Sequence, residues 1–324
     1  MDILVEIKQP IRQELDLLNR ALAQELASTN QLLNSVVDYY LSTKGKQMRP
    51  ILVLLAARLF GEIRKETIDA ALSIELLHNA SLIHDDVVDA TFQRRGKESV
   101  NAIWDNRIAV LVGDFFVSTA LKCSLSTNDI EIVSTLSQLG RDLAWGEIEQ
   151  LDNVRRKILS EEAYFEVINK KTASLFVACI KVGARSSGKS DERVKHLLSF
   201  GEKLGMCFQI KDDIFDYFND PAIGKPTGND IREGKVTLPL IYALSQADKA
   251  TRKHYTDLLE KIHLTNDEIH TLIEFAKANG GIEYAEKVMY RFQDEALQTI
   301  EIFKESPVYL SLKNILQYTI ERKK

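Results

Sequence analysis

The 324-residue sequence contains few residues that interrupt helices. Glycine occurs 15 times and proline six times, and both counts fall below average usage of about 7% and 5%. No Asn-Gly or Asp-Gly pair stands between two runs of alternating apolar residues, so β-hairpins are not expected. Apolar residues recur at spacings of three and four along most of the chain, which predicts an all-α fold.

Cysteine is scarce as well. Cys123, Cys179 and Cys207 are scattered, odd in number and set in apolar stretches, as expected for reduced core residues of a cytosolic protein. The first residues include Asp2 and Glu6 and lack a basic segment followed by an apolar one, so we expect no secretory signal. Together these features favour a cytoplasmic location.

Long apolar runs and long basic runs are both missing. The longest apolar stretches, such as "ILVLLAA" after Pro50, are far shorter than the ~20 residues of a membrane span, so we expect no integral membrane segment. A net charge of -5 without a long basic run argues against nucleic-acid binding. No GxxxxGK[ST] pattern or glycine-rich βαβ signature is present, which disfavours a nucleotide on a P-loop or Rossmann fold.

The chain shows little sign of division. No linker rich in serine, glycine or proline separates two parts, so we expect a single domain over residues 1–324. One long irregular stretch, "NDPAIGKPTGNDIREGK" at 219–235, interrupts the helical pattern. Loops of that length inside compact domains are usually functional or disordered.

Two short acidic stretches resemble each other. The first is "HDDVVD" at 84–89 and the second is "KDDIFD" at 211–216. On a helix that turns about 100° per residue, Asp86 lies about 100° and Asp89 about 40° from Asp85, so these carboxylates share one sector. Each stretch predicts a cluster of three carboxylates: Asp85, Asp86 and Asp89, and Asp212, Asp213 and Asp216.

The clusters have two interpretations. One cluster alone is explained about equally well as a solvated helix end, because short acidic patterns are common. The second cluster, however, is flanked by the apolar stretches "MCFQI" and "IFDYF". Neighbouring carboxylates repel one another unless a cation lies among them, and Mg²⁺ typically joins one or two carboxylates to substrate phosphates. We therefore favour two metal-binding clusters that face one another across a helical core.

Basic side chains suited to phosphate occur near these clusters. Each one alone is explained as a surface charge. Together with six carboxylates they indicate a substrate that carries phosphates, bound by metal ions on one side and fixed cations on the other. The candidates are Lys46, Arg49, Arg94, Arg95, Lys171, Lys225 and Lys235.

Six ordered motifs carry a resemblance to a known family. The chain is similar to the trans-isoprenyl diphosphate synthases, the all-helical polyprenyl synthetases, from about 44 to 239 and beyond. The motifs are "GKQMRP", "SLIHDDVVDATFQRRG", "GEIEQ", "KTASLF", "FQIKDDIFD" and "GKPTGNDIREGKVTLPL". One departure is Lys44, which stands where the family usually has the first of two glycines. The resemblance implies a single large helical bundle around a central elongated active-site cavity.

The family chemistry implies an Mg²⁺-dependent prenyltransferase that adds isopentenyl diphosphate to an allylic diphosphate in the trans configuration. Mg²⁺, three ions with substrate bound, would be held by Asp85, Asp89 and Asp212, with the other three aspartates nearby or ligating through water. Departure of the diphosphate leaves an allylic cation, so metals and cations stabilise the leaving group. The catalytic residues implied are Asp85, Asp86, Asp89, Lys171, Thr172, Gln209 and Asp212.

The resemblance also implies the two substrate sites. The carbonyl of Lys171, the hydroxyl of Thr172 and the amide of Gln209 would stabilise the cation. The isopentenyl diphosphate site would comprise Lys46, Arg49, His78 and Arg95. The allylic diphosphate site would comprise Arg94, Lys171, Lys225 and Lys235. The released diphosphate is expected to be the base for the final proton loss.

Product length is expected to depend on the residues that precede the first cluster. Ala80 and Ser81 lie about one turn before Asp85, where short-chain members of the family often have Phe or Tyr. Two small side chains leave the path open, which favours a long-chain polyprenyl diphosphate, as used for a respiratory quinone side chain. A short-chain farnesyl or geranylgeranyl synthase is the alternative.

Two further alternatives come from other functional classes. A class I terpene cyclase would ionise the same kind of substrate but typically lacks the second aspartate cluster and the isopentenyl site. A non-catalytic subunit of a heteromeric synthase would carry degraded acidic clusters, whereas both are intact here. We also expect a homodimer and transient contact with a membrane during product release.

Overall fold

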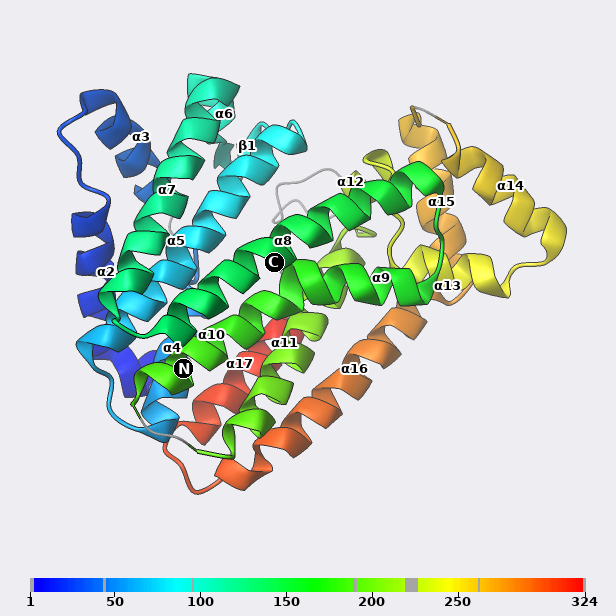
Figure 1. The fold of residues 1–324 in the computed structure, drawn as a ribbon. Coiled ribbons are helices and arrows are strands. Elements are labelled where there is room, and N and C mark those ends of the chain that lie inside the picture. Colours follow the sequence, from blue (N-terminus) through cyan, green and yellow to red (C-terminus); the bar gives the residue numbers. More distant parts are fainter. Residues whose placement is uncertain are drawn as a thin grey trace. The chain divides into compact units, whose positions relative to one another are not determined.

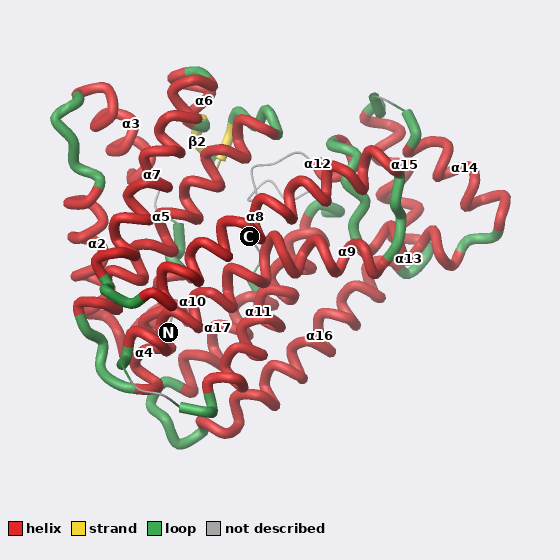
Figure 2. The backbone as a smooth tube through the Cα atoms, viewed as in Figure 1, coloured by secondary structure: helices red, strands yellow, loops and turns green. Residues whose placement is uncertain are grey.

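The computed structural model describes residues 3–42, 45–94, 96–188, 191–218, 227–261 and 263–322. These residues are almost entirely helical (Figures 1 and 2), so the prediction of an all-α fold is confirmed. The exception among them is a short antiparallel pair, β1 (Gln93–Arg94) and β2 (Lys97–Glu98). It lies between α5 (Lys65–Val88) and α6 (Val100–Trp104).

The chain divides into two compact units. Unit 1 consists of Met1–Arg141, Leu175–Gly201 and Thr299–Ile315. Unit 2 consists of Asp142–Ser174, Glu202–Gln298 and Leu316–Lys324. The first aspartate cluster therefore belongs to unit 1 and the second to unit 2, and the prediction that they face one another stays a prediction.

Unit 1 begins with helices that the apolar periodicity predicted. They are α1 (Ile3–Lys8), η1 (Gln9–Ile11), α2 (Arg12–Glu25), α3 (Gln31–Ser42), α4 (Met48–Phe60), α5 (Lys65–Val88), α6 (Val100–Trp104) and α7 (Asn106–Ser126). Pro50 lies in the first turn of α4, where its missing N–H is not needed. The rest of α4 is apolar and buried on nearly all sides, so it forms the core of the unit.

Helices α5 and α7 pack side by side along much of their length (Figure 1). Their closest approach is at Gly113, where an added Cβ would lie 2.1 Å from His84 Nε2. His84 Nε2 also lies 3.2 Å from the carbonyl of Val110. These contacts give His84 a packing role between the two helices.

Unit 1 is completed by parts of helices from later in the chain. These are the first part of α8 (Ile130–Arg156), most of α10 (Ser174–Ser186), the start of α11 (Val194–Phe215), η3 (Glu301–Phe303) and the start of α17 (Tyr309–Glu321). Gly183 of α10 lies against α4, because a Cβ there would be 2.3 Å from the carbonyl oxygen of Val53. A larger residue at 183 would push these two helices apart.

Unit 2 contains the remaining parts of α8, α11 and α17 together with helices of its own. These are α9 (Glu161–Ile168), the π-helical turn η2 (Asn169–Ala173), α12 (Asn229–Arg232), α13 (Leu238–Gln246), α14 (Lys249–Leu259), α15 (Asn266–Ala278) and α16 (Gly281–Ile300). Helix α13 packs on α15, and Tyr255 of α14 stacks on Phe275 of α15 with ring centroids 3.8 Å apart. Helix α11 carries the second aspartate cluster at its C-terminal end.

One described helix, α7, is long and apolar enough to cross a membrane by length and composition alone. About half of its 18-residue window (44%) is buried inside the protein, as in a core helix. Its remaining face carries exposed apolar side chains, and such stripes on helices often bind protein.

Candidate active site

The first aspartate cluster lies at the C-terminal end of α5. The helix ends at Val88, with Asp89 as its C-cap and Ala90 in the left-handed region at φ +48°. Asp85 and Asp89 are partly exposed, whereas Asp86 is buried. The C-terminal end of a helix carries partial negative charge, so carboxylates gathered there favour the arrival of a cation.

Asp86 is held by an arginine of the same unit. Arg94 Nε lies 2.9 Å from both carboxylate oxygens, and Arg94 Nη2 lies 2.7 Å from Oδ1. Asn101 Nδ2 donates a 3.1 Å hydrogen bond to the backbone carbonyl of Asp86. The structure thus brings two predicted site residues together, because Arg94 and Asp86 form an ion pair with each other.

The predicted isopentenyl diphosphate residues that the structure describes all belong to unit 1. Lys46 is exposed, Arg49 is partly buried, and His78 is buried on α5. The Arg49 guanidinium lies 5.4 Å from the ring centroid of Phe176, the last residue of the "KTASLF" motif. Arg95 lies outside the described residues.

The two predicted chain-length positions differ in accessibility. Ala80 is completely buried, whereas Ser81 is partly accessible. The Ser81 hydroxyl donates a 2.9 Å hydrogen bond to the carbonyl of His78 in its own helix. Ser81 therefore presents no bulk beyond the helix surface, and it is the more accessible of the two small residues.

The second cluster, in unit 2, contains a buried carboxylate at the centre of a hydrogen-bond network. Asp213 accepts 2.6 Å and 2.8 Å hydrogen bonds from the Tyr164 hydroxyl and from Gln209 Nε2. Gln209 Oε1 in turn accepts a 2.7 Å hydrogen bond from the Thr172 hydroxyl. The predicted residues Thr172, Gln209 and Asp213 are thus joined in one chain of contacts.

The pKa values of two carboxyl groups in this cluster are raised by burial and by the negative charge of their neighbours. Burial raises the pKa of Asp213 to about 7, and the neighbouring carboxylates of Asp212 and Asp216 add to the effect. Burial also raises the pKa of Asp230 well above its usual range, again with help from Asp213 and Asp216. A cation near these oxygens would favour their ionised forms.

Asp216 anchors the chain that follows the long irregular stretch. Its Oδ1 and Oδ2 accept hydrogen bonds of 2.9 Å from the backbone N–H groups of Asn229 and Asp230. Its backbone carbonyl accepts one of 2.8 Å from Gly228, which adopts a left-handed φ of +73°. Asp216 thereby fixes α12 and Asp230 against the cluster.

Asp212 has a partner from the far end of the sequence. Arg322 Nη2 donates a 2.7 Å hydrogen bond to Asp212 Oδ1. The side chain of Asp212 remains 40% exposed, whereas that of Arg322 is only 10% exposed. Asp212 is therefore the accessible carboxylate of a cluster in which Asp213 is buried.

The predicted lysines of unit 2 are also tied to acidic or amide groups. Lys171 Nζ lies 2.6 Å from Glu147 Oε1 and 2.9 Å from Gln150 Oε1, both in the "GEIEQ" motif. A Cβ at Gly146 would lie 2.9 Å from the backbone nitrogen of Lys171, so close approach of these segments requires glycine. Lys235 Nζ lies 2.6 Å from Glu233 Oε2. Lys225 lies outside the described residues.

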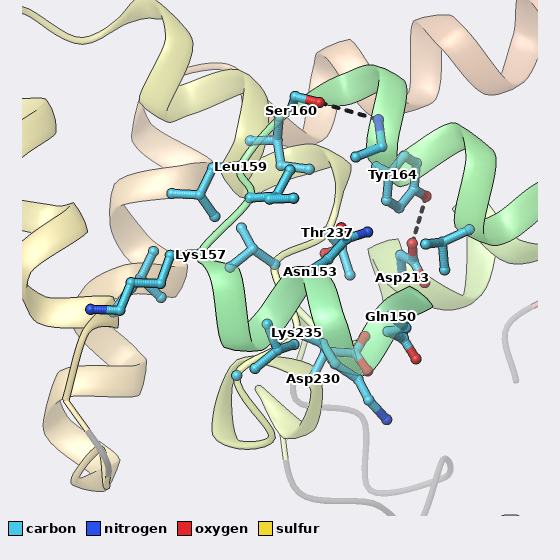
Figure 3. A pocket seen from close by; sticks show the side chains of 18 of the residues that line it. Gln150, Asn153, Lys157, Leu159, Ser160, Tyr164, Asp213, Asp230, Lys235 and Thr237 are labelled. Carbon is cyan, nitrogen blue, oxygen red and sulfur yellow. Dashed lines mark hydrogen bonds between the residues drawn. The ribbon is translucent and has the colours of Figure 1, made fainter. Parts of the chain in front are cut away.

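A pocket opens within unit 2 beside this network (Figure 3). Its wall includes the predicted site residues Lys171, Gln209, Asp213 and Lys235. Asn153 also lines it, and Asn153 Oδ1 is buried with no hydrogen-bond partner among the described residues. The apolar part of the wall is formed by Val154, Ile158, Leu159, Ala163, Val167, Ile168, Val236, Ile241 and Leu259. The cavity can hold a molecule with both polar and apolar parts.

Reasoning from the sequence missed three residues of the second cluster. Asp230 stands inside a motif that had been recognised, so its carboxylate could have been noted. Tyr164 and Arg322 carry no such signal, because their hydrogen bonds to Asp213 and Asp212 span 49 and 110 residues of sequence. Only packing brings them to the aspartates.

The residues present fit Mg²⁺, which takes some of its ligands from the substrate, better than a metal ion whose ligands all come from the protein. Within the described part of the chain, no group of three or more His, Cys, Asp or Glu side chains is arranged to hold a metal ion. The donors at both clusters are carboxylate oxygens, and the raised pKa of Asp213 indicates uncompensated negative charge. Mg²⁺ prefers hard oxygen ligands and typically takes one or two carboxylates together with substrate phosphates.

Comparison with known proteins agrees with this chemistry. Residues 30–276 match the polyprenyl synthetase family. The octaprenyl diphosphate synthase of Escherichia coli K12 is 32% identical over 323 residues, covering 98% of this chain and 99% of that protein.

Solved structures show the same fold. A crystal structure of a geranylgeranyl pyrophosphate synthase from Bacteroides thetaiotaomicron is 42% identical, with a TM-score of 0.86 over 99% of this chain and 100% of that one. A polyprenyl synthase from Caulobacter crescentus CB15, complexed with calcium and isoprenyl diphosphate, has a TM-score of 0.91 at 29% identity and covers 99% and 98% of the two chains. The predicted isoprenoid synthase type of fold is confirmed by these likenesses.

Proposed function

The chain belongs to the polyprenyl synthetase family and is a trans-prenyltransferase, and on that basis we propose that it makes a long-chain polyprenyl diphosphate. It would condense an allylic diphosphate with successive molecules of isopentenyl diphosphate. The observation that carries the proposal is the hydrogen-bond chain from Thr172 through Gln209 to Asp213. This chain connects the groups suited to stabilising a carbocation with the carboxylates suited to a metal-bound leaving group.

The network orients each group that the reaction uses. Because Gln209 Oε1 accepts from Thr172 and its Nε2 donates to Asp213, the amide has one orientation. Thr172 lies in the π-helical turn η2, which departs from the regular hydrogen-bond pattern of an α-helix, as is frequent at functional sites. Lys171, in the same turn, presents its ammonium group next to Glu147 and Gln150.

Each aspartate cluster, within its own unit, offers carboxylates to Mg²⁺. When bound, Mg²⁺ would neutralise the diphosphate that leaves the allylic carbon. Asp85, Asp89 and Asp212 are partly exposed and would be the direct ligands, whereas Asp216, also partly exposed, already accepts hydrogen bonds from Asn229 and Asp230. Asp86 and Asp213, which are buried and held by Arg94 and Tyr164, would support them.

The second substrate would be bound in unit 1. Lys46 and Arg49 supply fixed positive charge for the diphosphate of isopentenyl diphosphate, and His78 lies two helical turns before the first cluster on α5. Arg49 rests over Phe176, which limits its orientations. Charge-assisted hydrogen bonds of this kind are about twice as strong as neutral ones.

The small residues before the first cluster support a long product. Ser81 is accessible and turns its hydroxyl back onto α5, and the similarity to an octaprenyl diphosphate synthase points the same way. A geranylgeranyl product is the second candidate, favoured by the 42% identity to a geranylgeranyl pyrophosphate synthase. A long product would suit the side chain of a respiratory quinone.

We propose a homodimer joined through α7. Five of its apolar residues are more than a third exposed and recur at helical spacing, which indicates a stripe suited to another apolar helix. They are Val110, Leu111, Val117, Leu121 and Leu125. A stripe that binds its own copy is self-complementary, as the interface of a twofold dimer must be.

The proposed activity is tested by incubating the protein with farnesyl diphosphate, labelled isopentenyl diphosphate and Mg²⁺. The products are extracted with an organic solvent and their chain lengths are measured. A labelled linear polyprenyl product longer than four isoprene units supports the proposal, and one of four units supports the geranylgeranyl alternative. Unlabelled hydrocarbon would instead identify a cyclase, and no turnover would identify a non-catalytic subunit.

A further inference from the structure

The last described residue of the chain, Arg322, is built into the second aspartate cluster. It follows α17, and its side chain is only 10% exposed. Arg322 Nη2 donates to Asp212 Oδ1 at 2.7 Å and to the carbonyl of Phe208 at 3.0 Å. Arginine side chains are mostly exposed and are rarely buried unless they are paired, so burial here calls for a physical reason.

Several contacts hold the guanidinium in one place. It lies over the ring of Phe208 at 4.2 Å and within 5.6 Å of the ring centroid of Phe215, so aromatic faces flank it. Its Nε donates a 3.2 Å hydrogen bond to the carbonyl of Thr319 in the last turn of α17. Cation–π contacts favour this position of the guanidinium, and its planar group of donors is preorganised, so pairing costs arginine less conformational entropy. Arg322 is therefore a rigid partner for Asp212.

Asp212 remains accessible despite this partner. Its side chain is 40% exposed, and the hydrogen bond with Arg322 involves Oδ1. A carboxylate that is held by a rigid partner and is still partly exposed is preorganised to bind a metal. Partners that orient metal ligands in this way typically change metal affinity or activity about 10- to 100-fold when they are removed.

We infer that Arg322 is a positioning residue that orients the Asp212 carboxylate for the metal and diphosphate. The inference rests on the proposed function, because that function makes Asp212 a metal ligand. Arg322 acts through Asp212 and needs no contact with either substrate. The C-terminal end of α17 is thereby part of the active site, although it lies more than 100 residues after the second cluster in sequence.

The test measures metal binding without prenyl substrate. Mn²⁺ is titrated into the protein in the presence of inorganic pyrophosphate, and free Mn²⁺ is measured by electron paramagnetic resonance. Arg322→Gln is expected to weaken Mn²⁺ binding about 10-fold or more. Arg322→Lys keeps the charge but loses the planar fork, so it is expected to lie between Arg322→Gln and the wild type.

A control removes an exposed arginine elsewhere in the same unit that also lies over an aromatic ring. Arg291 lies over the ring of Phe292 at 5.4 Å and contacts no residue of the cluster in the described structure. Arg291→Gln is expected to bind Mn²⁺ as the wild type does. Circular dichroism of each variant checks that the helices are retained, and Arg322→Lys serves if Arg322→Gln does not fold.

Two outcomes separate this inference from the proposed function. If Asp212→Ala loses Mn²⁺ binding but Arg322→Gln binds as the wild type does, the inference is wrong and the proposed metal site stands. Tighter binding by Arg322→Gln would make the arginine a competitor of the metal and would equally overturn the inference. Wild-type binding by Asp212→Ala would contradict the proposed metal site itself. In an Asp212→Asn background, Arg322→Gln should add no further loss, since the arginine acts through the carboxylate.

Discussion

The hydroxyl of Tyr164 lies 2.6 Å from Asp213 Oδ2, and both side chains are buried in unit 2. Burial and the nearby carboxylate of Asp213 raise the pKa of Tyr164 well above its usual range. The raised pKa favours the protonated hydroxyl, which is the form that donates to Asp213. A buried carboxylate is stable only when such partners are present, so this pair supports both the fold of unit 2 and the geometry of the second cluster.

Removing the hydroxyl should destabilise the protein. Tyr164→Phe keeps the ring but leaves Asp213 with one fewer donor, and hydrogen bonds to charged groups contribute about 1.5 to 3 kcal/mol. We expect the free energy of unfolding, measured by urea denaturation at pH 8, to fall by about this amount, and turnover to be reduced. Tyr255→Phe, which keeps its ring stack with Phe275, is the control and should change stability by less than about 0.5 kcal/mol. Equal effects of the two substitutions would contradict the assigned role.

The accessible aspartates should be essential for turnover and dispensable for folding. Asp85→Ala and Asp212→Ala each remove a carboxylate that would join the metal to the diphosphate. We expect activity to fall to background while the circular dichroism spectrum stays unchanged. Asp257→Ala, at an exposed position of α14, should retain full activity. Near-wild-type activity of either cluster variant would mean that these aspartates are not catalytic.

The two diphosphate sites should respond separately to loss of charge. Lys46→Ala should mainly raise the apparent KM for isopentenyl diphosphate, because Lys46 belongs to the predicted site for that substrate in unit 1. Lys235→Ala should mainly affect the allylic substrate, because Lys235 lines the cavity beside Asp213. Steady-state kinetics with each substrate varied in turn will show this split. If each variant weakened both substrates equally, the division of the basic residues would be wrong.

Bulk placed before the first cluster should shorten the product. Ser81→Phe introduces an aromatic ring at an accessible position, and chain-length analysis should show fewer isoprene units. Ala80→Tyr should have the same effect with a greater loss of stability, since Ala80 is fully buried and overpacking costs about 1 to 3 kcal/mol.

The control for this series is Lys65→Phe, at the exposed start of the same helix. Its products should match those of the wild type. A wild-type product of only three or four isoprene units would contradict the predicted long chain. An unchanged product distribution in both Ser81→Phe and Ala80→Tyr would show that these two positions do not limit chain length.

A charge within the α7 stripe should disrupt the proposed dimer. Leu121 is 48% exposed, and Leu121→Glu would bury a carboxylate against the partner helix, which is strongly unfavourable without a counter-charge. We expect size-exclusion chromatography with light scattering to show a shift from dimer to monomer. Leu310→Glu, at an equally exposed leucine of α17, should leave the dimer intact. A wild-type protein that is monomeric at micromolar concentration would contradict the proposal directly.

Local features of the sequence determined the helices and the spacing of the aspartates. The helical character of α11 follows from its apolar period of 3.6 residues per turn, which is a property of the segment alone. The same geometry placed Asp85, Asp86 and Asp89 close together at one end of α5, and no tertiary contact was needed to predict it. The helix stops at Val88, and Ala90 adopts a left-handed conformation.

The tertiary structure decided which partner holds each aspartate. The spacing of the aspartates alone does not distinguish the members of a cluster, but Asp86 is paired with Arg94, Asp213 with Tyr164, and Asp212 with Arg322. These partners differ in burial, so they leave Asp212 accessible while Asp213 is enclosed. Two of the three hydrogen bonds join residues that are 49 and 110 positions apart. Local propensity cannot specify such pairs, because they form only when helices distant in sequence pack together and remove the carboxylates from water.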